Sequence, residues 1–170
     1  MREIEVIMSK IKFFLLMISL IVIDQISKIF VVMNKESLPK TIINGLLDFT
    51  YCENRGIAFG FASGHVQFFS ILTLIILVII VGLVCFKFTK IKGIYAVGVA
   101  MLIAGGFGNF IDRAFRSYVV DFIDISSFFE FPIFNFADIC VVIGVVIVAI
   151  ASIVNYRREE ASENNSWWVW

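Results

Sequence analysis

Two aspartates in this sequence lack a basic neighbour at helical spacing. Asp121 follows two valines in an apolar run, and Asp138 opens another apolar run. Two carboxylates in close contact cannot both ionise, so one keeps its proton and the other stays a base. Such a pair can activate water and protonate a leaving amine. Spacing alone leaves a proton or cation relay equally open, and Asp124 competes as a partner for Asp121.

Residues suited to other chemistry are scarce. The chain has three cysteines and one histidine, with no C-x-x-C or Cys/His pairing. The sequence therefore predicts neither a disulfide framework nor a metal site. Any chemistry would have to use carboxylates.

The amino-acid composition indicates what kind of fold must position these acids. Of 170 residues, 60% are hydrophobic and 16% are charged, whereas soluble domains carry about 25% charged residues. A soluble fold of this size cannot bury so much apolar surface. The formal net charge is zero, so there is no basic excess to indicate a nucleic-acid partner. We expect an integral membrane protein.

Four apolar runs are long enough to span a bilayer, which takes roughly 20 helical residues. They cover residues 11–33, 66–88, 94–111 and 136–154. The third run is rich in small residues, which allow helices to pack closely.

The segments between these runs predict a smaller part built of strands. Residues 34–65 carry turn residues among short apolar pairs, as in short strands on a membrane surface. Residues 118–125 alternate enough to form a strand or a re-entrant segment. The predicted fold class is an all-α membrane protein of four transmembrane helices, with a small β-rich extracytoplasmic cradle over residues 34–65. One membrane domain covers residues 1–158, and residues 159–170 form a tail with no assigned role.

Basic residues set the expected orientation. They gather before the first run, between the second and third, and after the fourth: Arg2, Lys10, Lys12, Lys87, Lys90, Lys92, Arg157 and Arg158. The positive-inside rule then places both termini in the cytoplasm.

Apart from the basic residues at the inner ends, the ionisable side chains of the spans lie in their outer halves or at their outer ends, together with one asparagine: Asp24, Lys28, Asn109, Asp112, Arg113 and Asp138. An ionisable side chain at a helix centre costs about 2.5 to 3.5 kcal/mol to insert, so a bundle should gather these groups into one site. Asp24 and Lys28, four residues apart, predict an ion pair that orients the site. Asn109, Asp112 and Arg113 predict a hydrogen-bonding brace. A relay should have acids at several depths, and none falls in an inner half.

Five stretches follow one another along the chain: residues 24–28 (DQISK), 54–59 (NRGIAF), 105–113 (GGFGNFIDR), 119–122 (VVDF) and 131–138 (FPIFNFAD). In this order they resemble the lipoprotein signal peptidase family, also called signal peptidase II, the aspartyl proteases of bacterial membranes. Ser117 departs from the pattern, since a glycine is common there, and so does Ile57, where alanine is usual.

The resemblance implies an aspartic endopeptidase that cuts prolipoproteins just before a cysteine carrying diacylglycerol. It implies Asp121 and Asp138 as the catalytic pair. The supporting residues would be Asn54, Gly56, Asn109, Arg113 and Asn135, and the structural polar residues Asp24, Lys28 and Asp112.

The resemblance also implies no metal and no cofactor. It places the chain in the bacterial cytoplasmic (inner) membrane, with the site at the extracytoplasmic face. We expect membrane lipid and the prolipoprotein as partners, no nucleic acid, and a monomer. Two alternatives stay open: a small proton-coupled transporter that uses these carboxylates as a relay, and a non-catalytic chaperone or scaffold for lipoproteins.

Overall fold

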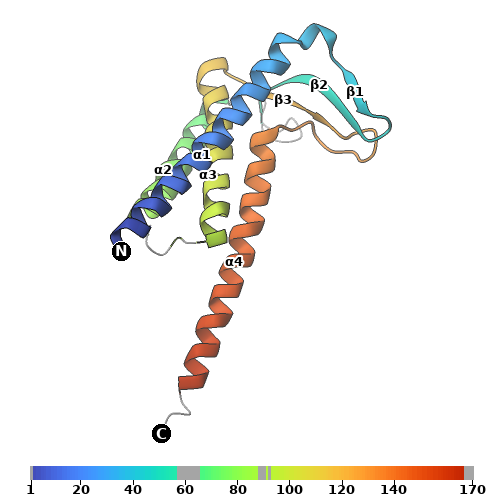
Figure 1. Cartoon of the computed structure of the whole chain (residues 1–170). Helices are drawn as coiled ribbons and strands as arrows, with labels where there is room; N and C mark the ends of the chain where they lie inside the picture. Colours follow the sequence, from blue (N-terminus) through green and yellow to red (C-terminus); the bar gives the residue numbers. More distant parts are fainter. Residues whose placement is uncertain (1, 57–65, 88–90, 92, 167–170) are drawn as a thin grey trace.

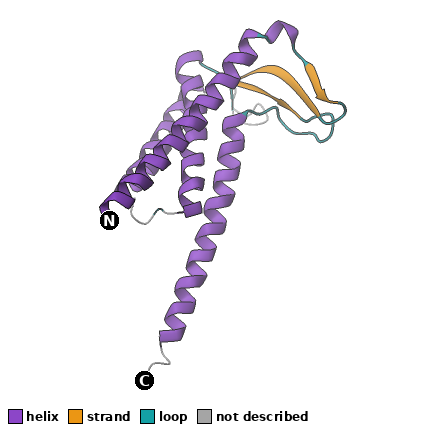
Figure 2. Cartoon of the chain, viewed as in Figure 1, coloured by secondary structure: helices purple, strands orange, loops and turns teal. Residues whose placement is uncertain are grey.

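The computed structural model describes residues 2–56, 66–87, 91 and 93–166. The elements are α1 (Arg2–Met33), the short 3-10 helix η1 (Lys35–Ser37), β1 (Lys40–Ile43), β2 (Leu47–Asn54), α2 (Val66–Lys87), α3 (Gly93–Arg116), β3 (Val119–Asp124) and α4 (Phe136–Ser166). The helices form a bundle, and the strands form a sheet at the end opposite to the start of α1 (Figures 1 and 2). The departure at Ile57, the rest of the stretch up to residue 59 and the last residues of the tail, 167–170, fall outside the described residues.

Three helices are long and apolar enough to cross a membrane, over Ile4–Met33, Gly93–Arg116 and Phe136–Arg158. The apolar part of α2, Ser70–Phe86, is shorter, so these criteria do not confirm the fourth expected span. Helices α1, α3 and α4 also extend beyond the apolar runs that predicted them. Apolar runs report only the lipid-facing part of a helix, whereas polar helix-forming residues continue it into water.

The sheet draws on two distant segments. Its strand order is β1-β2-β3, and both pairs are antiparallel. Two strands come from residues 34–65, as expected, and the third comes from residues 119–124, where the sequence left a strand or a re-entrant segment open. On the other side of β3, Ile123 forms a bridge with Phe134, so the sheet leads directly into the start of α4.

Packing on α1 fixes which way β3 faces. Val120 and Phe122 are buried against Val31 of α1, and the Phe122 ring meets Phe49 edge-on, with centroids 5.7 Å apart. Successive side chains of a strand point to opposite faces. Asp121, between these two residues, therefore points away from that apolar layer and lies among the polar groups at the ends of α3 and α4.

Helix α3 lies at the centre of the bundle and contacts α1, α2 and α4. Its glycines allow this. A Cβ at Gly98 would lie 2.7 Å from the Ile147 side chain, one at Gly105 would collide with the Ala137 carbonyl, and one at Gly108 with the Asp24 carboxylate. The close-packing role predicted for these small residues is confirmed, and it brings the polar residues of α1, α3 and α4 into contact.

Ser117 joins α3 to β3 with a left-handed φ of 64°. This explains why glycine suits the position, since a Cβ there costs about 1 to 2 kcal/mol. We expect Ser117→Gly to raise the free energy of unfolding by about 0.5 to 1 kcal/mol, because glycine removes this strain but also gains freedom in the unfolded chain. Thermal unfolding in detergent measures the change.

The matched control is Ser126→Gly, in a turn where φ is not positive. That variant should lose stability, because glycine there only adds freedom to the unfolded chain. Equal shifts in the two variants would contradict the strain at Ser117.

Candidate active site

The Asp121 carboxylate accepts a hydrogen bond on each oxygen, both from asparagine side chains. Asn135 Nδ2 donates to Oδ1 at 2.6 Å, and Asn54 Nδ2 donates to Oδ2 at 2.8 Å. Asn54 is held in turn by the backbone N–H of Gly56, which donates to its Oδ1 at 3.0 Å. Asp121 is 3% exposed, so two neutral donors and little water surround this carboxylate.

The Asp138 carboxylate is fixed where α4 begins. Its Oδ2 accepts the backbone N–H of Asn135 at 3.1 Å, and its own N–H donates to Asn135 Oδ1 at 3.1 Å. This reciprocal pair has the form of a capping box, with asparagine and aspartate in the two positions. Asn109 Nδ2 donates to the other oxygen of Asp138 at 2.8 Å.

One fully buried side chain links the two acids. Asn135 Nδ2 donates both to Asp121 Oδ1 and, at 3.1 Å, to Asn109 Oδ1, while its Oδ1 holds the Asp138 N–H. Asn109 then completes the link by donating to Asp138. The two acids singled out by the sequence thus lie in one hydrogen-bonded cluster.

A buried ammonium group, that of Lys28, is hydrogen-bonded to this cluster through Asn109. Lys28 Nζ lies 3.0 Å from Asp24 Oδ2, 3.0 Å from Asp112 Oδ2 and 2.9 Å from Asn109 Oδ1. Lys28 and Asp112 are 0% exposed and Asp24 is 1% exposed. The predicted Asp24–Lys28 ion pair is confirmed. Asp112 is a partner in the same network through Oδ2, and its other oxygen, Oδ1, forms an ion pair with Arg116.

The two acids of this network also hold backbone groups beside Asp121 and Asp138. Asp112 Oδ2 accepts the N–H of Val120 at 3.1 Å, and Asp24 Oδ1 accepts the N–H of Ala137 at 3.0 Å. Val120 immediately precedes Asp121, and Ala137 immediately precedes Asp138. The Lys28 network therefore anchors the chain one residue before each candidate catalytic acid.

Arg113 is half-buried and lies close enough to Asp138 and Asp121 to interact electrostatically with both. Its guanidinium hydrogen bond, however, goes to the Asn109 carbonyl at 3.5 Å. The brace predicted from residues 109–113 is thus divided, with Asn109 at the acids and Asp112 at Lys28.

Burial raises the pKa of Asp121 to about 6. The Asp138 charge acts in the same direction, whereas the hydrogen bonds from Asn54 and Asn135 lower it. A carboxyl with this pKa exchanges its proton near neutral pH, as acid–base chemistry requires.

Asp124 does not compete for Asp121. It lies at the end of β3, and its Oδ1 accepts the Ser126 N–H at 2.9 Å, so it caps the following turn. Among the described residues, no three His, Cys, Asp or Glu side chains are arranged to hold a metal ion.

The sequence did not predict three residues that neighbour the site. Gln25 donates to Asp24 Oδ2 and to the Gly108 carbonyl, Arg116 pairs with Asp112, and Cys52 is directly opposite Asp121 in the sheet. The four-residue spacing of Asp112 and Arg116 is a local signal that could have revealed the second of these. Nothing local identifies Cys52, since strand register sets its place.

The Lys28 network generates a stability prediction. Lys28→Met leaves Asp24 and Asp112 with less compensation in a buried site, and removing one partner of a buried ion pair costs about 3 to 5 kcal/mol. We expect a loss of that size in denaturant unfolding in mixed micelles. The triple variant Asp24→Asn/Lys28→Met/Asp112→Asn should recover part of it.

Lys12→Met, an exposed position on the same helix, is the matched control and should change stability by less than about 0.5 kcal/mol. If Lys28→Met costs no more than this control, the network is not the support that the geometry indicates.

Known proteins are similar to this chain in sequence and in overall structure. The signal peptidase (SPase) II family model matches residues 16–154. The lipoprotein signal peptidase of Fusobacterium nucleatum is 40% identical over 89% of this chain and 91% of its own length, and that of Lactiplantibacillus plantarum is 39% identical over 81% and 91%.

Two solved bacterial membrane enzymes superpose with TM-scores of 0.77 and 0.69. Each is 35% identical, covering 85% and 82% of this chain and 89% and 91% of theirs. A family model that matches most of the chain, together with relatives of this identity, shows that the chain belongs to the signal peptidase II family.

Proposed function

We propose that this chain removes signal peptides from prolipoproteins by aspartic catalysis, with Asp121 and Asp138 as the acid–base pair. The observation that carries this proposal is the linked arrangement of the two carboxylates. Neutral amides of Asn54, Asn109 and Asn135 hold the buried Asp121 and the half-buried Asp138 in one hydrogen-bonded cluster.

The chemistry needs one proton shared between the two acids. The ionised carboxylate takes a proton from water as the water oxygen attacks the scissile carbonyl carbon. The protonated partner gives its proton to the carbonyl oxygen, which forms a tetrahedral diol. As the diol collapses and the C–N bond breaks, the first carboxyl delivers its proton to the leaving amine. One diol hydroxyl returns its proton to the partner carboxylate as the new carbonyl forms, which restores the shared proton.

The substrate proposed for this site is a prolipoprotein whose cysteine already carries diacylglycerol, and the cut is made just before that cysteine. Relatives named lipoprotein signal peptidase support this assignment. The cluster lies where β3, α3 and α4 meet, beside the sheet (Figure 1). A site at that depth suits a bond at the end of a membrane-embedded signal helix.

We place the chain in the bacterial cytoplasmic membrane, with four spans, both termini in the cytoplasm and the sheet outside. Helix α2 has 22 residues, which at 1.5 Å per residue is about 33 Å and matches the roughly 30 Å bilayer core. Basic residues at the bundle end remote from the sheet support this orientation.

A transporter is not supported. Every buried charged or amide side chain in the described part of the chain belongs to the cluster above: Asp24, Lys28, Asn109, Asp112, Asp121 and Asn135. A relay across the membrane needs such groups at several depths.

Removing either catalytic carboxylate should abolish cleavage. We expect Asp121→Asn and Asp138→Asn each to lower kcat/KM by about 10³-fold, the scale of acid–base catalysis, with purified protein and a lipidated preprolipoprotein. Asp124→Asn, on the same strand as Asp121, is the matched control and should cleave like the unaltered protein. Undiminished cleavage by either first variant would remove that residue from the pair.

The pKa of Asp121 predicts a limb near pH 6 in the profile of kcat/KM against pH. The rate falls below pH 6 if Asp121 is the base, and above pH 6 if it holds the proton.

Because the hydrogen bond from Asn54 lowers the pKa of Asp121, Asn54→Ala should move this limb to higher pH. Asn34→Ala, which loses only a hydrogen bond to the Phe30 carbonyl, should leave the limb in place. A limb that stays at its original pH in Asn54→Ala would contradict the assignment to Asp121.

A further inference from the structure

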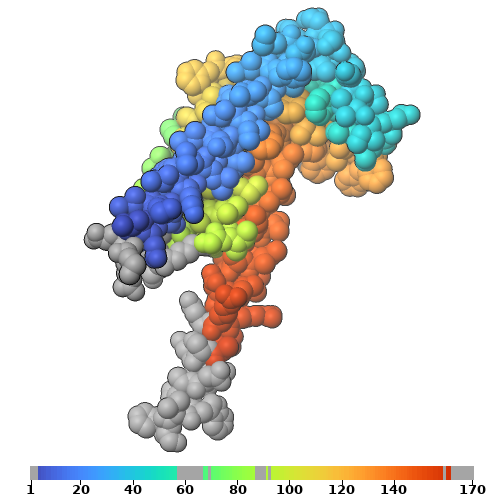
Figure 3. Space-filling model, in the orientation of Figure 1, coloured from blue at the N-terminus to red at the C-terminus, as the bar shows by residue number. Residues whose placement is uncertain are grey.

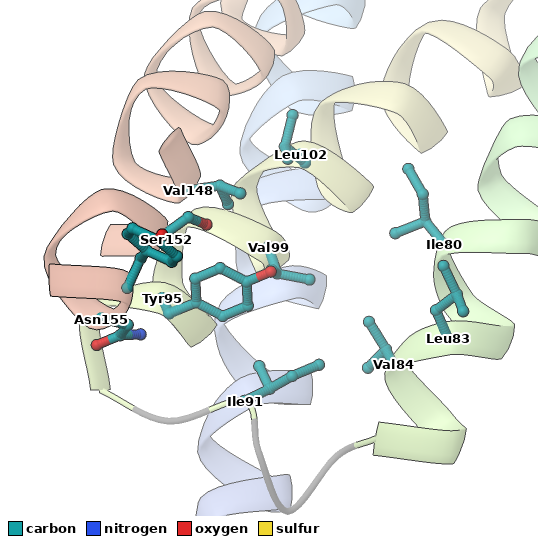
Figure 4. Close-up of a pocket in the computed structure, with 11 residues that line it drawn as sticks. Ile80, Leu83, Val84, Ile91, Tyr95, Val99, Leu102, Val148, Ser152 and Asn155 are labelled. Carbon is teal, nitrogen blue, oxygen red and sulfur yellow. The ribbon is translucent and has the colours of Figure 1, made fainter. Parts of the chain in front are cut away.

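A groove unrelated to the acid cluster opens at the other end of the bundle. It lies between α2 and α4, with α3 as its floor, and its volume is about 590 Å³. Figure 4 shows Ile80, Leu83 and Val84 of α2 on one side and Val148 and Ser152 of α4 on the other. The volume lies in the range of about 300 to 1,000 Å³ that is usual for ligand sites.

The lining of this groove has a polar end. Its apolar lining runs along α3 through Val99 and Leu102, whereas its polar residues gather where α3 begins. The polar lining residues are Tyr95, Ser152, Asn155 and Tyr156. An apolar channel with hydroxyl and amide groups at one end fits an amphiphile whose head lies at that end.

One charged side chain lies beside this polar end. A second groove, on the other side of the contact between α3 and α4, shares Tyr95 and Asn155 and is also lined by Arg158. Arg158 is the only charged residue among the described lining of the two grooves. Helix α4 continues past the start of α3 here (Figure 3), so Arg158, three residues beyond Asn155, lies beside the polar end of the first groove without lining it.

These features favour a lipid over the signal helix of a substrate. A signal peptide begins with positively charged residues, which Arg158 would repel. A purely apolar helix would leave the hydroxyl and amide groups at the polar end of the groove without hydrogen-bond partners. An anionic lipid matches both the change from apolar to polar lining along the groove and the positive charge of Arg158. Basic pockets between helices at the cytoplasmic side are typical sites for anionic headgroups.

We propose that this groove binds an anionic phospholipid. An acyl chain lies against Val99, Leu102 and Val148, and the phosphate lies at the polar end, where Tyr95 and Asn155 donate hydrogen bonds and Arg158 supplies the charge. The lipid would fill the gap between α2 and α4 and hold α2 in place from the side that α3 leaves open.

The experiment is native mass spectrometry of the full chain in detergent, titrated with dioleoyl phosphatidylglycerol or dioleoyl phosphatidylcholine. We expect tighter binding of phosphatidylglycerol. Arg158→Gln should weaken that binding about fivefold, the loss expected for one cation near a membrane phosphate, and leave phosphatidylcholine binding unchanged. Ser152→Phe, which places a ring in the groove, should weaken phosphatidylglycerol binding further while prolipoprotein cleavage continues.

Arg157→Gln is the matched control, because Arg157 is the exposed neighbour and lines neither groove. Equal losses in the two arginine variants would show general surface attraction and overturn the proposal. Equal binding of the two lipids would also overturn it. If Ser152→Phe abolishes cleavage and leaves lipid binding intact, the groove receives the substrate instead. Lipid binding is measured without substrate, so its failure and a failure of the proposed peptidase activity are separate results.

Discussion

The structure of the candidate site depends on one buried ammonium group. Lys28 is fully enclosed and has three acceptors within 3.0 Å, on Asp24, Asp112 and Asn109. An isolated charge in this environment would be very costly, and only pairing with complete hydrogen bonding offsets that cost. The three acceptors come from two helices, α1 and α3, so satisfying Lys28 fixes the depth and rotation of one helix against the other. The glycines of α3 make this possible, since a side chain at Gly108 would displace the Asp24 carboxylate.

The position of the candidate catalytic acids follows from the same interaction. Asp112 accepts the N–H of Val120, and Asp24 accepts the N–H of Ala137, which are the residues just before Asp121 and Asp138. Lys28 also occupies one lone pair of Asn109 Oδ1, which leaves the Asn109 amide group directed at Asp138. An acid on a strand and an acid at a helix start thus become neighbours because both are anchored to the same cation. Local propensity alone would not bring them together.

The sequence predicted the parts of this arrangement that have local signals. Apolar runs located the helices, and the four-residue spacing of Asp24 and Lys28 located their ion pair. The third strand could not be assigned to the cradle, because β3 pairs with β2, about seventy residues earlier in the chain, and an alternating pattern carries no information about its partner. Asn135 was named from resemblance, yet its role as a link is tertiary, since its amide reaches Asp121 on the sheet and Asn109 on α3. Helix lengths were underestimated because α1 and α4 continue as polar helix beyond their apolar parts.

The two pairs of acids differ in which groups compensate their charges, and this difference agrees with the structural role proposed for one pair and the catalytic role proposed for the other. Asp24 and Asp112 face cations, Lys28 and Arg116, so their charges are needed to balance a buried network. Asp121 and Asp138 instead accept hydrogen bonds from amides, which are neutral donors. The nearest guanidinium, that of Arg113, donates to a backbone carbonyl and to neither carboxylate. Amide donors fix the position of a carboxylate without holding it ionised as firmly as a salt bridge would. An acid held in this way keeps its place while its proton comes and goes, which is the property that a shared-proton mechanism needs and that a salt-bridged aspartate at the same depth lacks.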